Sequence, residues 1–228
     1  MDLNKKIVVI TGSSEGLGLE LAKQFLQEGS QVIISSRDKD KLLKAAKDIG
    51  AVPIAADVSK EKQVQSLASQ VSEQLGRIDI WINNAGVWYK HGSVLDLDMK
   101  KVHDIFEVNV FGTMYGTREA LRIMQKQEQG TIMNILSVSA LSGRPGSSSY
   151  CASKFAADGF TKSIREEVRE KNITVISVYP GGMKTKFFDE KKPADYDQYL
   201  NISEVATKII ENLKLDSPQE EQILRRQK

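Results

Sequence analysis

Short apolar runs rich in β-branched residues alternate along the chain with longer stretches in which apolar residues recur every three or four positions. The short runs predict strands, and the longer periodic stretches predict amphipathic helices. The predicted strands are Ile7–Ile10, Gln31–Ser35, Val52–Ala55, Ile78–Ile82, Thr131–Leu136, Thr174–Val178 and Gln222–Arg225, the last with the weakest pattern. The predicted helices are Leu17–Glu28, Lys39–Ile49, Glu61–Leu75, Met99–Gln127, Ala152–Lys171 and Ser203–Leu213.

This alternation predicts an α/β fold, a doubly wound parallel sheet of Rossmann type with helices on both faces. The 228 residues contain no repeat and no break in composition, so we expect one domain over residues 1–228. Ligands of such sheets bind at the carboxyl ends of the strands. The polar stretch Lys184–Leu200 interrupts the pattern. Loops of this length are often functional, so we expect it to cover a substrate, with a disordered excursion as the alternative.

Composition excludes several classes of function. The chain has 27% charged residues, and its net charge of +2 is spread over interspersed acidic and basic positions. A nucleic-acid or anionic-membrane partner requires a basic patch, which this pattern lacks. One cysteine, Cys151, and two histidines, His91 and His103, predict neither a disulfide nor a metal site. No apolar run resembles a signal peptide or a membrane span, so we expect a cytoplasmic protein.

A glycine-rich turn follows the first predicted strand directly. It reads Thr11-Gly12-Ser13-Ser14-Glu15-Gly16-Leu17-Gly18 and leads into a predicted helix. Glycines permit a tight turn and let the backbone approach a pyrophosphate, which the helix N-terminus stabilises. The spacing differs from the general Gly-x-Gly-x-x-Gly pattern, and a plain strand-to-helix connection is the alternative. Its place after the first strand favours a nucleotide site.

The end of the second predicted strand indicates which nucleotide is bound. A carboxylate there would bind a ribose 2′-hydroxyl and select NAD, but this chain has Ser36 followed by Arg37. A guanidinium can receive a 2′-phosphate through charge-assisted hydrogen bonds. We therefore expect NADP(H) as the preferred cofactor. Glu15 and Asp38 oppose this preference, so NAD(H) stays possible.

Tyr150 and Lys154 form a candidate site for proton transfer. They lie four positions apart, which places them on one face of a helix. A phenol has an ordinary pKa of about 10, and a nearby ammonium group is expected to lower the pKa of Tyr150 towards neutrality. Ser137, thirteen residues upstream, supplies a second hydroxyl that can polarise a carbonyl without a metal. Chance spacing, and Ser139 in place of Ser137, are the alternatives.

These residues resemble the short-chain dehydrogenase/reductase family in order and spacing over almost the whole chain. The matching features are the Thr11–Gly18 loop, Asn83-Asn84-Ala85-Gly86, Asn109, Ser137 with Tyr150 and Lys154, and Pro180-Gly181 followed by Thr185. The resemblance implies that Tyr150 exchanges a proton with the carbonyl oxygen and that Lys154 lowers its pKa and holds the nicotinamide ribose. It implies that Ser137 binds the substrate oxygen and that Asn109 holds a water linking Lys154 to solvent. A structural kink or cap is the alternative for Asn109.

The loop and the resemblance together predict the residues that contact the cofactor. They are Gly12, Ser14, Glu15, Gly16, Leu17, Gly18, Ser36, Arg37, Asp57, Val58, Asn84, Ala85, Gly86, Tyr150, Lys154, Pro180, Gly181, Met183 and Thr185. Asn83 is expected to line the same cleft. Asp57 is expected to contact the adenine, and initiation of a turn or helix is its alternative.

The substrate is less defined by the sequence. Trp88 and Tyr89 form either a pocket wall or packing beneath a loop, whereas Met183, Phe187 and Phe188 are expected to face the pocket. These side chains suggest an apolar or medium-sized carbonyl compound.

The resemblance also implies self-association. The Met99–Gln127 and Ala152–Lys171 helices supply either a subunit interface or ordinary core. Because little follows the last strand, we expect a homodimer, with a tetramer possible.

The predicted function is NADP(H)-dependent hydride transfer between the nicotinamide and a carbonyl or alcohol, with Tyr150 as general acid and base. The alternatives are a sensor or scaffold that binds NADP(H) without catalysis, and isomerase or dehydratase chemistry on the same site.

Overall fold

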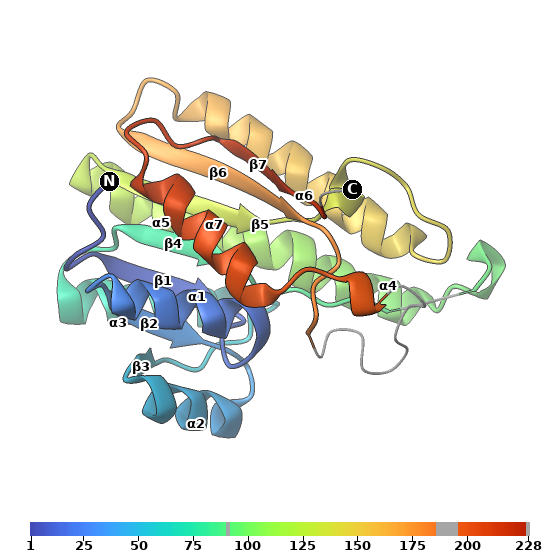
Figure 1. The fold of residues 1–228 in the computed structure, drawn as a ribbon, viewed down its shortest axis with the longest axis horizontal. Coiled ribbons are helices and arrows are strands. Elements are labelled where there is room, and N and C mark those ends of the chain that lie inside the picture. Colours follow the sequence, from blue (N-terminus) through green and yellow to red (C-terminus); the bar gives the residue numbers. More distant parts are fainter. Residues whose placement is uncertain (90–91, 186–195, 227–228) are drawn as a thin grey trace.

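The computed structural model describes residues 1–89, 92–185 and 196–226, which form a parallel sheet with helices on both faces (Figure 1). Seven strands follow the order β3-β2-β1-β4-β5-β6-β7. The strands are β1 (Ile7–Thr11), β2 (Gln31–Ser35), β3 (Val52–Pro53), β4 (Ile80–Asn83), β5 (Gly130–Ile135), β6 (Ile173–Pro180) and β7 (Glu221–Leu224). The expected doubly wound α/β fold is confirmed.

Helices connect successive strands. The α-helices are α1 (Gly16–Gln27), α2 (Lys39–Ile49), α3 (Glu61–Leu75), α4 (Met99–Phe106), α5 (Gly112–Gln127), α6 (Ser148–Glu167) and α7 (Ile202–Lys214). Shorter helical segments are η1 (Val94–Asp96), η2 (Glu107–Phe111), η3 (Val138–Ala140) and η5 (Tyr196–Gln198), of which η2 is π-helical. No helix within the described ranges has both the length and the apolar character that crossing a membrane requires.

Alternation along the central strands divides the core between the two faces of the sheet. On β1, Val8 and Ile10 join one buried cluster, whereas Ile7 and Val9 join the other. Successive side chains of a strand point to opposite faces, and here helices cover both faces. This arrangement explains why the strands read as continuous apolar runs.

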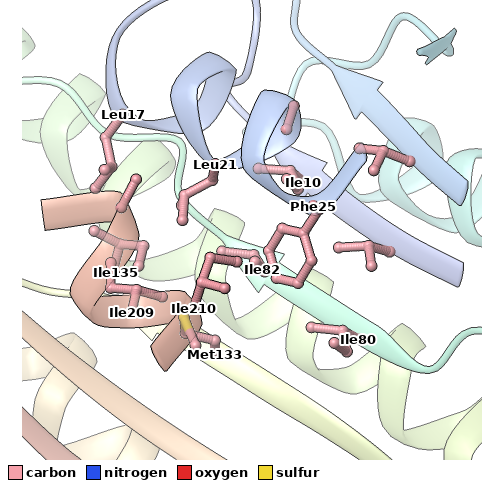
Figure 2. Packing of buried hydrophobic residues seen from close by; sticks show 14 of the residues in the cluster. Ile10, Leu17, Leu21, Phe25, Ile80, Ile82, Met133, Ile135, Ile209 and Ile210 are labelled. Atoms are coloured by element: carbon pink, nitrogen blue, oxygen red, sulfur yellow. The ribbon is translucent and has the colours of Figure 1, made fainter. Parts of the chain in front are cut away.

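Helices α1 and α7 pack side by side over one face, and α3 and α5 cover the other (Figure 1). Figure 2 shows Phe25 and Leu21 of α1 and Ile209 and Ile210 of α7 gathered around the strand residue Ile82. Phe25 is fully buried, and truncation of such a side chain to alanine typically costs about 3–5 kcal/mol. This packing fixes the position of α1 on the sheet, and the first residues of α1 belong to the glycine-rich turn.

Most predicted bounds differ from the observed ones by one or two residues, and three differences are informative about the fold. The Met99–Gln127 stretch was predicted as one helix from its apolar periodicity, but it is divided into α4, the π-helical segment η2 and α5. Strand β3 has two residues, Val52 and Pro53, at the sheet edge, and the Ile54 amide after it still donates to the Ile34 carbonyl at 3.0 Å. Helix α6 begins at Ser148 instead of Ala152, which places Tyr150 in its first turn.

Candidate active site

A cleft of about 620 Å³ opens at the carboxyl ends of β1, β4, β5 and β6. The strand order reverses between β1 and β4, which are parallel neighbours although three helices separate them in sequence. Such a switch point is where doubly wound sheets bind ligands, because the connections leave β1 and β4 on opposite sides. The fold therefore places the cleft where the sequence predicted a ligand.

The glycine-rich turn forms one wall of this cleft. Gly12 has φ +62°, and a Cβ there would lie 2.6 Å from the Cα of Ala85. Gly16 has φ +61°, a conformation that side chains disfavour. Gly18 does not line the cleft, contrary to the sequence prediction. It instead packs against the side chain of Asn84, which a Cβ would approach to 2.5 Å.

Two neighbouring asparagines at the end of β4 have different surroundings. Asn84 lines the cleft, and its Nδ2 donates to the carbonyls of Thr11 and Gly12, both at 2.9 Å. Asn83 does not line the cleft, which corrects the expectation from the resemblance. It is buried, accepts from the Trp81 indole at 2.8 Å and donates to Asn134 at 2.8 Å. Strand alternation sends the two side chains in opposite directions.

The start of α1 suits a phosphate group. Its N-cap, Glu15, makes no side-chain capping bond, and the first turn has no acidic residue. The first amide groups of α1 are therefore free of a side-chain cap, and they form the end of a helix dipole that favours anions. In α2, by contrast, Asp38 accepts from the Lys41 amide at 3.1 Å. The cradle and the cleft volume fit a dinucleotide cofactor.

Positive side chains gather where the second strand meets the cleft. Arg37 and Lys41 both line it, beside the buried Ser36. Asp38 also lines the cleft, but its carboxylate caps α2 and lies 3.7 Å from Lys41 Nζ, so it is directed at Lys41. Asp57 lines the cleft, and its carboxylate also accepts hydrogen bonds from the Ser59 amide and hydroxyl. It therefore forms a turn, as the alternative for Asp57 proposed, and still lies in the cleft.

Ser137 and Tyr150 converge from β5 and α6. Ser137 precedes η3 and accepts from the Ser139 amide at 3.1 Å, which fixes its side chain. A hydrogen bond joins the Ser137 and Tyr150 hydroxyls. Ser139 lines the cleft as well, but the bond to Tyr150 comes from Ser137, as the spacing favoured.

The pKa of Tyr150 departs from the sequence prediction. Desolvation raises it to about 12, while the hydrogen bond from Ser137 and the charge of Arg144 act in the opposite direction. Lys154 was expected to lower this pKa, but it contributes no resolved effect and its Nζ lies 5.8 Å from the centre of the phenol ring. The protein's own groups therefore keep Tyr150 in its protonated, acidic form at neutral pH.

Lys154 is itself strongly desolvated. Its side chain is buried, its Nζ donates to the Ile135 carbonyl at 3.0 Å, and burial lowers its pKa to about 8. A methyl group on Gly86 would lie 3.8 Å from this Nζ and 3.4 Å from Asn109 Oδ1. The ammonium and the asparagine oxygen thus both lie near Gly86, which lines the cleft.

Asn109 lies behind the cleft, within the π-helical segment η2. Its Oδ1 accepts from the Val87 amide at 2.8 Å, and its Nδ2 donates to the Val87 carbonyl at 3.0 Å and to Ser153 Oγ at 3.1 Å. The side chain therefore joins the loop after β4 to α6. This geometry agrees with the structural alternative for Asn109, and the predicted water relay stays a prediction.

Buried polar contacts hold α6 against the sheet. Tyr179 of β6 donates to Asp158 at 2.7 Å, and Asn134 of β5 donates to Thr161 at 2.9 Å. Buried bonds of this kind are costly to break, because each leaves an unpaired polar group. They fix the orientation of the helix that carries Tyr150.

The other end of the cleft is mainly apolar. Trp88, Met183 and Tyr199 line it, and Trp88 donates to Ser147 Oγ at 3.3 Å, so Trp88 is a wall residue. Tyr89 is absent from the lining and lies beneath Lys101 Nζ at 5.6 Å.

Part of the predicted covering segment lies outside the described residues, namely 186–195 with Phe187 and Phe188. Its described ends meet in a bridge between Met183 and Leu200, and the Lys184 amide donates to the Leu200 carbonyl at 3.0 Å.

Sequence reasoning missed two cations of the cleft, Lys41 and Arg144. Lys41 lies four positions after Arg37, within reach of the same site once α2 is recognised. Arg144 is the one charged residue between Ser137 and Tyr150, and this isolated charge could have indicated from the sequence that it belongs to the site.

The remaining predicted residues all line the cleft. They are Gly12, Ser14, Glu15, Gly16, Leu17, Ser36, Arg37, Asp57, Val58, Asn84, Ala85, Gly86, Ser137, Tyr150, Lys154, Pro180, Gly181, Met183 and Thr185.

Comparison with known proteins agrees with this geometry. The chain is similar to an archaeal alcohol dehydrogenase from Thermococcus sibiricus complexed with 5-hydroxy-NADP, with a TM-score of 0.88, 26% identity and coverage of 97% of this chain and 96% of that one. It is also similar to a short-chain dehydrogenase/reductase from Burkholderia phymatum in complex with NAD, with a TM-score of 0.90, 25% identity and coverage of 98% and 90%.

Among curated proteins, the oxidoreductase YxnA of Bacillus subtilis is 29% identical over 222 residues. The match covers 91% of this chain but only 62% of that relative's length. The family model described as short chain dehydrogenase matches residues 6–195, which include the glycine-rich turn, Ser137, Tyr150 and Lys154. The chain therefore belongs to the short-chain dehydrogenase/reductase family.

Proposed function

We propose that this protein is an NADP(H)-dependent reductase of carbonyl compounds, or in reverse a dehydrogenase of alcohols. The observation that carries the proposal is the hydrogen bond between Ser137 and Tyr150 at the wall of a cleft that also contains the glycine-rich turn. A protein that only bound a nucleotide would have no use for this pair. The alcohol dehydrogenase from T. sibiricus supports the same class of reaction.

The residues have separable tasks. The glycine-rich turn and the N-terminus of α1 would hold the pyrophosphate, and Lys154 would hold the nicotinamide ribose. When bound, the nicotinamide supplies or accepts the hydride, so the protein itself needs to move only one proton. Ser137 orients the carbonyl oxygen, and Tyr150 donates its proton to that oxygen in reduction. The raised pKa of Tyr150 suits an acid, because the phenol stays protonated at neutral pH.

NADP(H) is the proposed cofactor because of the charges at the end of β2. Arg37 and Lys41 line the cleft, and Arg37 pairs with no carboxylate among the residues that the structure describes. A 2′-phosphate would receive charge-assisted hydrogen bonds there. Asp38 opposes this preference less than the sequence suggested, because its carboxylate is engaged with α2 and Lys41.

Paired titrations with NADPH and NADH, followed by nicotinamide fluorescence, test this choice. We expect NADPH to bind more tightly, and Arg37→Ala to weaken NADPH about tenfold or more while changing NADH little. Equal affinities in the wild type would contradict the NADP(H) preference and direct the substrate search to NAD and alcohols.

Turnover of a panel of carbonyl compounds with NADPH tests the reaction. We expect Tyr150→Phe to abolish NADPH oxidation while leaving NADPH affinity nearly intact. Tyr115→Phe is the matched control, because Tyr115 does not line the cleft. Tight NADPH binding without reduction of any panel member would favour a sensor or scaffold. Substrate conversion without net NADPH oxidation would favour isomerase or dehydratase chemistry.

A homodimer is the proposed assembly. Phe111 at the end of η2 and Phe155 on α6 are exposed by 41% and 48%, and both lie on the side of the sheet covered by α5 and α6. Burying such side chains in a subunit interface is favourable. Sedimentation velocity should give a dimer that Phe155→Lys dissociates, and a wild-type monomer would contradict the proposal.

A further inference from the structure

Arg144 lies on the segment that links the two hydroxyls of the site. It lines the cleft and is the only charged residue between Ser137 and Tyr150. A turn defines its backbone, because the Ser147 amide donates to the Arg144 carbonyl at 3.3 Å and the intervening Gly146 has φ +66°. The second and third positions of this turn are Pro145 and Gly146. A type II turn needs a positive φ at its third position, which glycine provides, and proline is common at its second. Arg144 therefore has a defined backbone position beside the first turn of α6.

Among the described residues, no carboxylate pairs with Arg144, whereas five other arginines form ion pairs. Each arginine that pairs with a carboxylate does so away from the cleft: Arg77, Arg118, Arg122, Arg165 and Arg169. Within residues 1–89, 92–185 and 196–226, neither cleft-lining arginine, Arg37 or Arg144, has a carboxylate partner. Arg37 serves the proposed phosphate site, which leaves Arg144 without an assigned ligand.

The charges of the cleft are segregated along its length. The acidic residues that line it are Glu15, Asp38 and Asp57, which all belong to the first three strands and their connections. The described lining from the segments that follow β4, β5 and β6, including α6, contains no carboxylate, and its cations are Arg144 and Lys154. The same end contains apolar walls. A ligand for it would need an apolar body and a negative charge.

Arg144, Ser137 and Tyr150 line the same cleft. The charge of Arg144 lowers the pKa of Tyr150, against the larger effect of desolvation. Trp88 is joined to the same turn through its bond to Ser147. A compound whose carbonyl meets Ser137 and Tyr150 can therefore extend along Trp88 towards the guanidinium.

Resting on the carbonyl reduction proposed above, we propose that the substrate is an oxo acid whose carboxylate is bound by Arg144 while its carbonyl oxygen is bound by Ser137 and Tyr150. A guanidinium matches a carboxylate through two parallel charge-assisted hydrogen bonds. In the reaction, the carbonyl carbon gains a hydride from NADPH and the oxygen gains the proton of Tyr150. The products are a hydroxy acid and NADP⁺, the carboxylate is unchanged, and the Tyr150 phenolate regains a proton from solvent.

The test compares an acid with its neutral isostere. The probes are 4-oxo-4-phenylbutanoate and its primary amide, each reduced with NADPH. We expect the wild type to prefer the acid by about tenfold or more in kcat/KM, the range of one charge-assisted pair. Arg144→Gln should reduce the acid-to-amide ratio to about one, and Arg144→Lys should give an intermediate ratio. The ratio is the right readout, because any effect of Arg144 on the pKa of Tyr150 alters both substrates alike.

Arg169→Gln is the matched control, since Arg169 lies beyond the far end of α6 and is exposed. Its acid-to-amide ratio should equal that of the wild type. An equal ratio in the wild type and Arg144→Gln would overturn the inference while leaving carbonyl reduction intact, and would restrict Arg144 to an effect on Tyr150.

Binding provides a second measurement that does not depend on turnover or on the folding of a variant. The non-reducible pair 4-phenylbutanoate and 4-phenylbutanamide is titrated into the wild-type complex with NADPH by calorimetry. Tighter binding of the acid supports the inference, and equal or weaker binding overturns it. Failure to reduce any carbonyl compound would instead overturn the proposed function, so the two failures are distinguishable.

Discussion

Replacement of Lys154 by methionine should stabilise the protein while abolishing its activity. Burial lowers the pKa of this ammonium from 10.5 to about 8, which means that folding disfavours the charged form. A difference of this size corresponds to roughly 3 kcal/mol at 25 °C. Loss of the bond to the Ile135 carbonyl offsets about 1 kcal/mol of the gain, and methionine has a similar volume. We therefore expect Lys154→Met to be about 2 kcal/mol more stable at pH 7.

The effect has a defined dependence on pH. Below pH 8, Lys154 is charged in both the folded and the unfolded wild type, so the cost of burying the charge is fully present. Between pH 8 and 10.5 the folded state loses its proton before the unfolded state does, so the stability of the wild type rises relative to the variant. The advantage of Lys154→Met should be largest near pH 7 and shrink towards pH 10.

Urea unfolding at 25 °C, followed by circular dichroism at pH 7 and pH 9.5, measures both quantities. Lys208→Met on α7 is the control, because its ammonium is on an exposed residue and should change stability by less than about 0.5 kcal/mol at either pH. A variant that is less stable than the wild type at pH 7 would refute the reasoning, as would an advantage that grows with pH. NADPH oxidation should be lost in every case.

Three further predictions concern the glycine-rich turn, the buried asparagine and the proton donor. Gly12→Ala should lower stability by about 2–4 kcal/mol and weaken NADPH binding, because its Cβ would lie 2.6 Å from the Ala85 Cα. Gly50→Ala, with a similar positive φ but nothing within 4 Å, should cost only about 1 kcal/mol in the same urea assay. Asn83→Ala should cost about 2–4 kcal/mol, since it leaves the buried Trp81 indole unpaired, and full wild-type stability would contradict the network. Because the pKa of Tyr150 is raised to about 12, alcohol oxidation, which needs the phenolate, should accelerate steadily from pH 7 to 10, whereas a flat profile would contradict its role as base.

The candidate residues for the chemistry could be named from the sequence because their spacing is local. Tyr150 and Lys154 share a helix face through an i, i+4 relation, and the glycines of the turn follow the first strand directly. The fold class was equally accessible, since continuous apolar strands between helices have few solutions other than a covered parallel sheet. These inferences needed no knowledge of contacts between distant segments.

The π-helical segment η2 was not accessible in this way. Its residues have the same apolar periodicity as α4 and α5, so the pattern predicted one uninterrupted helix. The bonds of Asn109 to Val87 and Ser153 accompany the change, and both partners come from other elements. Sequence analysis foresaw a kink at Asn109 only as an alternative to its expected role.

The sequence by itself determined the parallel α/β sheet and the position of the glycine-rich turn, and it named the candidate proton-transfer residues, because local periodicity and spacing encode them. Only the tertiary structure decided that Asn84, and not Asn83, faces the cleft and that Arg144 lines the same cleft as Tyr150. It also decided that the pKa of Tyr150 rises instead of falling. The physical reason is that desolvation and side-chain direction depend on segments distant in the sequence, which meet only when the sheet and its helices have packed.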